Sequence, residues 1–350
     1  MGSSAVILFG AGATRGAFVN SVPPPPVDRD FFEIAGQLNG RGTRRLAMRV
    51  IKDVFSLYNR VNGIGLEQYY RDVETRAEIG KFAKSKNKPM DWLRRQTDLE
   101  ELIRRVILHT TCDSADGSAH VSASKLHKEV LKHVREGDTL ITFNYDTVIE
   151  ESLGSSAPTW TPGDGYSLDA SGKTRGWAKS FVENRNLRHG ESSQVHLLKL
   201  HGSLNWTLYK NNKVRLKPRP YVVRARRGAP VSDKCSILPP GWHKRIDVNP
   251  YRQLWRTARL KMESCSALAI IGYSLPDTDL LARALFAEIS RLRAARKHYL
   301  KHLYLADPDD TVRERLLNVF VPALGPMGRV YRYKDIEEFS RATGWPNRRS

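Results

Sequence analysis

Short apolar runs, each followed by polar residues, recur along the chain. Residues 5–9 (AVILF) lead straight into Gly-Ala-Gly-Ala-Thr, and similar runs occupy residues 139–143, 195–200, 267–271 and 302–305. Continuous apolar runs of this length are typical of strands buried on both faces of a parallel sheet. Ligands of open parallel sheets bind at the carboxyl ends of the strands. We therefore expect the polar clusters to converge on one edge of one sheet.

Between the first two predicted strands the apolar spacing becomes helical. Prolines at positions 23–26 predict an exposed extended loop. After them, apolar side chains repeat every three or four positions over residues 46–57 and 99–107, the second stretch following a predicted capping box from Thr97 to Glu100. These patterns predict a layer of helices inserted between two strands.

The predicted fold class is therefore α/β, a Rossmann-like, doubly wound parallel sheet with an inserted helical layer. We expect a single domain over residues 1–350, with a helical insertion over residues 31–135. Residues 207–250 break the strand-and-helix pattern with several prolines and a run of cations from 213 to 227. We interpret them as a basic, proline-rich insertion.

Charge and cysteine content restrict the class of protein. The 350 residues carry a formal net charge of +20, which creates a field that attracts phosphate-bearing partners such as nucleic acid, or acidic proteins. The three cysteines include no C-x-x-C pair, which argues against disulfides and a four-cysteine zinc site and favours a reducing cytoplasm. The sequence shows neither a membrane-spanning run nor a secretion signal, so we expect a cytoplasmic protein without membrane partners.

The loop after the first predicted strand could hold phosphate. Its residues are Gly10, Ala11, Gly12, Ala13 and Thr14, and glycines allow backbone N–H groups to approach a pyrophosphate closely. Gly16 stands one place too late for the dehydrogenase pattern, so a standard dehydrogenase site is disfavoured. An ordinary glycine turn remains the alternative interpretation.

Two further strand ends carry candidate chemistry. Asn144 can donate and accept hydrogen bonds, as recognition of another amide requires, and Asp146 can accept from an amide or a ribose hydroxyl. A local Asx turn is the alternative for this pair. His201 follows the third strand beside a glycine, where an imidazole can act as acid or base near neutral pH.

Candidate binding residues also follow the last two predicted strands. Gly272 and Ser274 lie in Gly-Tyr-Ser, which resembles a second phosphate loop before a helix that is expected to begin near Thr278. Asp307 could accept from a ribose hydroxyl, although a turn cap beside Pro308 explains it equally well.

In this order, Gly-Ala-Gly-Ala-Thr, Thr-Phe-Asn-Tyr-Asp, Leu-His-Gly-Ser and Gly-Tyr-Ser resemble the signature series of the sirtuin superfamily. His-Gly-Ser-Leu-Asn-Trp and Gly-Tyr-Ser-Leu-Pro are especially similar to the sirtuin-like NAD hydrolases of bacterial antiphage systems. The resemblance implies that residues 10–14, Asp30, Gly272, Ser274 and Asp307 bind NAD. It also implies that Asn144 and Asp146 hold the nicotinamide and its ribose, and that His201 holds the ribose hydroxyls or the attacking water.

This resemblance implies an NAD+ glycohydrolase that takes NAD as its substrate, with Asn144, His201 and Asp146 as catalytic residues and no metal. Sirtuin deacylases carry a four-cysteine zinc module, and the basic insertion at 207–250 replaces it here, which disfavours deacylation. A non-catalytic NAD or ADP-ribose sensor is the other alternative. Uncontrolled hydrolysis would exhaust cellular NAD, so we expect gating by homo-oligomerisation or by a separately encoded ATPase or Argonaute-like partner, as in abortive infection.

Overall fold

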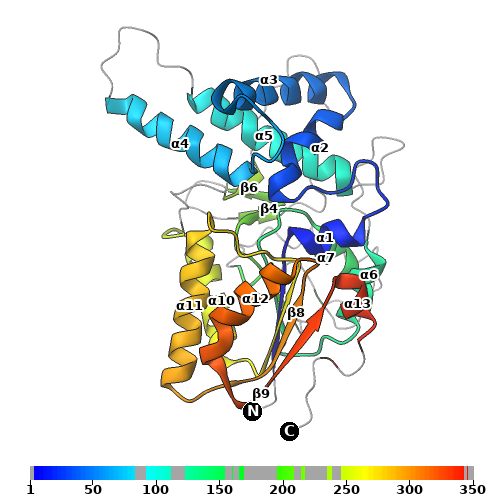
Figure 1. Cartoon of the computed structure of the whole chain (residues 1–350), viewed down its shortest axis with the longest axis vertical. Helices are drawn as coiled ribbons and strands as arrows, with labels where there is room; N and C mark the ends of the chain where they lie inside the picture. The colour runs from blue at the N-terminus through cyan, green and yellow to red at the C-terminus, as the bar shows by residue number, and fades with distance from the viewer. Residues whose placement is uncertain are drawn as a thin grey trace.

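A six-stranded, wholly parallel sheet forms the centre of the computed structural model, which describes residues 4–82, 92–111, 123–153, 160, 165–168, 195–208, 214–216, 235–238, 246–342 and 345 (Figure 1). The strand order is β3-β2-β1-β7-β8-β9, which confirms the predicted α/β fold class. The strands are β1 (Ala5–Phe9), β2 (Thr139–Thr142), β3 (His196–Lys199), β7 (Ala267–Ile271), β8 (Leu300–Ala306) and β9 (Leu324–Tyr333).

The strand order reverses direction at the centre of the sheet. From β1 the chain moves outward to β2 and β3 on one side, and then from β7 to β8 and β9 on the other. In register, Phe9 lies beside Thr142 on one neighbour and Ile271 on the other, so the carboxyl ends of β1, β2 and β7 are level. Such a switch point opens a crevice at the carboxyl edge of a doubly wound sheet.

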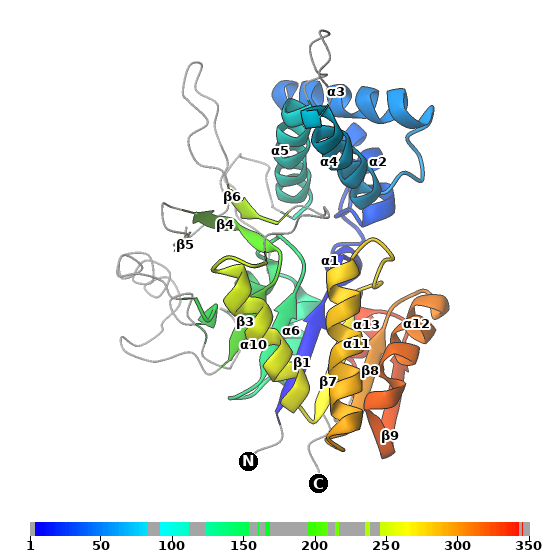
Figure 2. The same cartoon turned by 90° about the vertical axis from the view of Figure 1, so that its left-hand side faces the viewer.

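Helices cover both faces of the sheet (Figures 1 and 2). The strands β1, β2 and β7 are buried along their whole length, as the uninterrupted apolar sequences of β1 and β7 predict. One face carries α10 (Tyr251–Ser264), α11 (Leu280–Ala295) and α12 (Asp310–Phe320), and the other carries α1 (Ala11–Ala17), α6 (Lys125–Leu131), α7 (Val148–Leu153) and α13 (Ile336–Ser340).

A second group of helices stands above the carboxyl edge of the sheet (Figure 1). We call it the helical module. It has its own apolar core, to which the motif residue Tyr145 also belongs, together with Leu204. The module therefore packs directly on the polar clusters of the sheet. Its elements are η1 (Asp28–Asp30), α2 (Phe31–Gln37), α3 (Arg41–Tyr58), α4 (Leu66–Phe82) and α5 (Trp92–Thr111).

The predicted capping box from Thr97 to Glu100 is wrong, because α5 already begins at Trp92 and runs through both residues. Contacts upstream extend the helix. The guanidinium of Arg95 lies 3.1 Å from the carboxylate of Asp53 on α3 and 4.7 Å from the centre of the Trp92 ring. The contact with Asp53 joins two helices, and such a tertiary contact outweighs a local capping signal.

A small antiparallel sheet lies between the main sheet and α5 (Figures 1 and 2). Its strands are β5 (Val214–Leu216), β4 (Gly202–Leu208) and β6 (Cys235–Ile237), in that order. The polar residues Gly202 and Ser203, which follow His201, lie in β4. Most of the basic insertion at 207–250, including its cations from 217 to 227, lies outside the described residues.

The proline segment is not the exposed loop that its composition predicted. Pro25 is buried and its three proline neighbours are half-buried. Arg15 of α1 explains the difference, because its Nη1 donates to the Pro25 carbonyl at 2.6 Å and holds the segment over the sheet edge. Within the described part of the chain, no helix is long and apolar enough to cross a bilayer.

Candidate functional site

Two glycine loops interlock at the switch point between β1 and β7. The Gly12 amide donates to the Gly272 carbonyl at 2.8 Å, and the Gly10 amide donates to the Ile271 carbonyl at 2.9 Å. A Cβ atom at Gly10 would lie 2.4 Å from the Gly272 oxygen, and one at Gly272, where φ is +62°, would lie 2.1 Å from the Ala13 nitrogen. These glycines are therefore required for the two loops to pack against each other.

Thr14 joins the first loop to the end of β2. Its hydroxyl donates to Asp146 Oδ2 at 3.1 Å and accepts from Asn144 Nδ2, also at 3.1 Å. The Asn144 amide donates in addition to the Gly10 carbonyl at 3.0 Å, and Thr142 Oγ1 donates to the Phe9 carbonyl at 2.9 Å. The structure thus brings Gly10, Thr14, Asn144 and Asp146 together in one hydrogen-bonded cluster.

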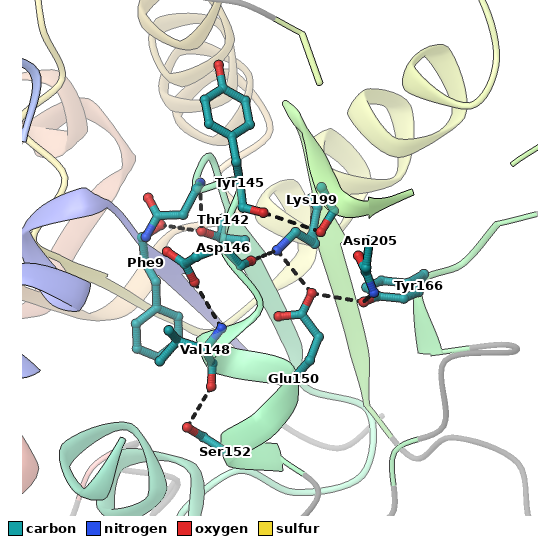
Figure 3. A network of polar contacts seen from close by, with 12 residues as sticks. Phe9, Thr142, Tyr145, Asp146, Val148, Glu150, Ser152, Tyr166, Lys199 and Asn205 are labelled. Carbon is teal, nitrogen blue, oxygen red and sulfur yellow. Dashed lines mark hydrogen bonds and ion pairs between the residues drawn. The ribbon is translucent and has the colours of Figure 1, made fainter. Parts of the chain in front are cut away.

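Asp146 also forms the local Asx turn that was the alternative interpretation for this pair. Its Oδ1 accepts from the Val148 amide at 3.0 Å, at the start of α7 (Figure 3). Asp146 is buried, whereas Asn144 is half-buried. Each carboxylate oxygen can accept more than one hydrogen bond, so these contacts leave acceptor capacity at Asp146.

His201 lies in an aromatic cluster next to this polar cluster. Its ring centre is 4.9 Å from that of Phe143 and 6.3 Å from that of Tyr145. Phe143 in turn stacks on Tyr273 of the second glycine loop, with the ring centres 4.6 Å apart. His201 is 5% exposed, so its imidazole is largely shielded from bulk water.

Contacts alternate along the segment that follows β2. Thr142 contacts Phe9 at the end of β1 and Asn144 contacts the first glycine loop, whereas Phe143 and Tyr145 contact His201. This is the two-residue alternation of an extended strand. Sequence analysis missed Phe143 and Tyr145 as parts of the site, although the alternation of polar and aromatic residues in Thr-Phe-Asn-Tyr-Asp was the signal for them.

A buried ion pair lies behind the turn that carries Asn144 and Asp146 (Figure 3). Lys199 Nζ is 3.0 Å from Glu150 Oε1 and also donates to the backbone carbonyl of Asp146. Tyr166 donates its hydroxyl to the same Glu150 oxygen at 2.8 Å, and Asn205 Nδ2 donates to Tyr166 at 3.2 Å. Burial raises the pKa of Glu150, and the Lys199 ammonium opposes that rise. Sequence analysis missed this network, whose signal was a single lysine inside an apolar strand.

The remaining predicted residues lie around this centre. Asp30 pairs with Arg15 of α1, with Oδ2 2.8 Å from Nη2, and its Oδ1 accepts from the Val27 amide. Asp307 is buried at the end of β8, where burial raises the pKa of its carboxyl group, and it accepts from the Asp309 amide at 3.0 Å. That bond is the turn cap of the alternative interpretation.

Ser274 is exposed, and its backbone carbonyl accepts from Arg315 Nη1 at 3.0 Å. The helix after the second glycine loop begins slightly later than the predicted Thr278. It starts at Leu280, because Asp279 caps it by accepting from the Ala282 amide. Asp279 also accepts from the Tyr273 hydroxyl at 2.8 Å, which fixes Tyr273 against Phe143.

His127 lies beneath the site and is fully buried, with its ring centre 5.3 Å from that of Phe9. Burial lowers its pKa to about 4, although the nearby carboxylate of Asp146 opposes the shift. The imidazole is therefore neutral at pH 7. Across the residues that the structure describes, no three side chains of the metal-binding types His, Cys, Asp and Glu form a group that could hold a metal ion.

A family model described as the SIR2-like domain matches residues 138–319, which is slightly more than half of the chain. The chain belongs to this family and hence to the sirtuin superfamily. The matched region contains the Asn144, His201 and Gly272 motifs, which confirms the resemblance of these motifs to the sirtuin superfamily.

Solved structures of the same superfamily are similar at low identity. A Sir2 homologue in complex with NAD aligns at 12% identity and a TM-score of 0.45 over 97% of this chain and 87% of its own. A Sir2 homologue mutant in complex with ADP-ribose aligns at 14% identity and a TM-score of 0.42 over 97% of this chain and 91% of its own. A search of curated proteins found no match.

Proposed function

We propose that this SIR2-like protein binds NAD+ at the carboxyl edge of its sheet and hydrolyses the bond between nicotinamide and ribose. The observation that carries the proposal is the junction of Asn144 with Gly10 and Thr14, which joins the end of β2 to the first glycine loop. A polar cluster at the switch point of a doubly wound sheet, in a SIR2-like chain, supports a dinucleotide as the ligand.

The chemistry of the bond determines what the site must supply. The nicotinamide ring of NAD+ is a pyridinium cation, and it departs as neutral nicotinamide. The leaving group therefore needs no protonation. The barrier lies in stabilising the oxocarbenium character of the ribose and in placing water against it, as in glycoside hydrolysis. The protein must therefore orient the nicotinamide, exclude bulk water and hold one water molecule at C1′.

We assign these tasks to three side chains. Asn144 orients the attacking water, because its amide is already fixed by two hydrogen bonds from Nδ2. Asp146 accepts from the nicotinamide carboxamide, and His201 polarises a ribose hydroxyl or the water. The aromatic rings of Phe143 and Tyr145 beside His201 provide a low-dielectric wall, in which such polar interactions are stronger than in water.

The phosphate and adenosine portions of NAD are assigned to the two loops. We propose that residues 10–14 and the Gly272–Ser274 segment bind the pyrophosphate, and that Asp307 and Asp30 bind ribose hydroxyls. The interlocked glycines support this by bringing both loops to one point. Asp30 would serve from η1, just after the proline segment, and Arg15 contacts both Asp30 and that segment.

Two other functions use the same site. In a non-catalytic sensor, NAD or ADP-ribose would bind without cleavage. In a sirtuin-type deacylase, NAD would be consumed only together with an acyl-lysine peptide. The chain has three cysteines, which is too few for a four-cysteine zinc module, and this favours hydrolysis over deacylation.

The proposed activity requires a gate, since free hydrolysis would deplete the cell of NAD. We propose that the protein acts in antiphage defence and is switched on by homo-oligomerisation or by a separately encoded ATPase or Argonaute-like partner. The helical module would receive that signal. It packs on the site through Tyr145, and Thr278 of the second loop donates to Glu67 of α4.

Nucleic acid is a further candidate partner, favoured by the outer helix of the module. The exposed residues of α3 include Arg44, Arg45 and Lys52, and α3 lies farthest from the sheet (Figure 1). Cations aligned on one helix can contact successive phosphates. Incubation of the purified protein with NAD, alone and with DNA, tests both proposals by the amounts of nicotinamide and ADP-ribose formed.

A further inference from the structure

The buried ion pair of Lys199 with Glu150 has no part in the chemistry assigned above. Both side chains are almost fully buried, with 1% and 3% of their surfaces exposed. Burying two charges costs free energy that an ion pair only partly recovers, so a buried pair is weak support for stability alone. The pair therefore points to a role other than stability.

The position of the pair indicates that role. Lys199 Nζ contacts Glu150 on α7 and the backbone carbonyl of Asp146, so one ammonium holds both the turn and the helix that follows it (Figure 3). Tyr166 and Asn205 extend the network to β4. The Asn144–Asp146 turn is thus fixed at its side chains by Thr14 and at its backbone by Lys199.

We propose that Lys199 is a positioning residue. Its ammonium fixes the peptide that follows Asp146, and thereby sets the positions of the Asn144 and Asp146 side chains relative to the first glycine loop. The proposal deepens the function proposed above and rests on it for its catalytic readout. Lys199 itself lies two residues before His201 and touches no reacting atom in this account.

A double variant distinguishes a positioning role of Lys199 from a role in stability alone. Lys199→Met leaves the Glu150 carboxyl buried without its cation, so the Tm should fall. Replacing both partners by apolar residues, in Lys199→Met/Glu150→Leu, removes that penalty and should restore most of the Tm. The Asp146 carbonyl still lacks its donor in the double variant. A displacement of about 1 Å at a reacting group can reduce turnover roughly 100-fold.

The matched control lies in the helical module. Arg95 and Asp53 form another partly buried ion pair, 3.1 Å apart, away from the turn. Arg95→Met should lower the Tm in a similar way but leave nicotinamide release per folded molecule unchanged. This variant shows whether a loss of stability alone lowers activity.

The decisive measurement compares the double variant with wild type by Tm, by kcat and KM for NAD, and by hydrogen–deuterium exchange of the amides of residues 143–148. We expect a restored Tm, a kcat roughly 100-fold lower with little change in KM, and faster exchange at the Asn144 and Val148 amides, which are hydrogen-bonded in the wild type. Wild-type kcat and exchange in the double variant would overturn the positioning role. If wild type releases no nicotinamide at any protein concentration, with DNA or with its neighbouring genes co-expressed, the proposed function fails, and the exchange measurement still tests the positioning role.

Discussion

Asn144 Nδ2 lies 3.1 Å from the hydroxyl oxygen of Thr14, and that hydroxyl donates onward to Asp146. One side chain on α1 thus fixes both polar residues at the end of β2. Since Thr14 is buried, its hydroxyl acts within the protein as the link between the first glycine loop and the candidate catalytic residues.

Thr14→Val keeps the shape of the side chain and removes this link. We expect the free energy of unfolding to fall by about 1–2 kcal/mol, because two hydrogen bonds are lost, and nicotinamide release to fall by more than tenfold. Thr110→Val is the matched control, since the buried Thr110 hydroxyl donates only to backbone carbonyls within α5. Equal activity losses in both variants would contradict a specific role for Thr14.

His201→Ala is predicted to abolish nicotinamide release while the protein remains folded, as judged by circular dichroism. The reason is that His201 is the group assigned to polarise a ribose hydroxyl or the attacking water, and an imidazole can act as acid or base in such a step. His302→Ala controls for loss of a buried ring, because His302 lies near the amino end of β8, far along the strand from the carboxyl edge. Retention of full turnover by His201→Ala would remove that assignment.

Gly272→Ala should disrupt the interlock of the two loops. The new Cβ would lie 2.1 Å from the Ala13 nitrogen at a residue with φ of +62°, so both a clash and backbone strain arise. Gly63→Ala shares a positive φ of +74° but meets no atom within 4 Å, so only the strain of roughly 1 kcal/mol is expected. Chemical denaturation should show a much larger loss for Gly272→Ala. Similar losses for the two variants would contradict the interlock.

Much of this arrangement was predictable from sequence because its signals are local. The apolar runs predicted the strands, and the residues that follow them predicted which edge carries the site. The start of α5 was not predictable from Thr97 and Glu100, because Arg95 and Asp53 meet across two helices. The Lys199–Glu150 ion pair was not predictable for the same reason, because its two residues lie far apart in the sequence and meet only in the folded chain.

The glycines illustrate a subtler difference. Their spacing predicted that backbone N–H groups approach a pyrophosphate closely, whereas the close approach in the structure is between the two loops, at Gly12 and Gly272. The spacing of glycines predicts that another group approaches the backbone closely, but it does not predict which group this is. The roles assigned toward NAD to residues 10–14, Asp30, Asn144, Asp146, His201, Gly272, Ser274 and Asp307 all stay predictions.

Stability should depend on pH through His127. Its pKa in the folded protein is about 4, below the ordinary value of 6.5, so between these values the unfolded chain binds more protons. Stability should therefore fall as the pH drops from 6.5 toward 4, by about 3 kcal/mol from this group. Urea denaturation across this range should show a weaker pH dependence for His127→Leu. An unchanged slope would show that the histidine is not buried in its neutral form.

Charge reversal on α3 tests the nucleic-acid proposal. The triple variant Arg44→Glu/Arg45→Glu/Lys52→Glu should weaken DNA binding and reduce the dependence of its logarithm on salt concentration. The control is Lys297→Glu/Lys301→Glu/Arg329→Glu, which changes the same charge on exposed positions near the amino edge of the sheet. Equal weakening by both sets would indicate attraction by net charge alone and contradict a specific α3 surface.

Nicotinamide release from NAD+ tests the central proposal most directly. The purified protein should be incubated with NAD+ over a range of protein concentrations, with and without DNA, beside Asn144→Ala. We expect wild type to form nicotinamide and an ADP-ribose product in equal amounts without an acylated peptide, and Asn144→Ala to form neither. Nicotinamide release by wild type that never exceeds that of Asn144→Ala, either in these incubations or in cells that co-express the neighbouring genes, would contradict it.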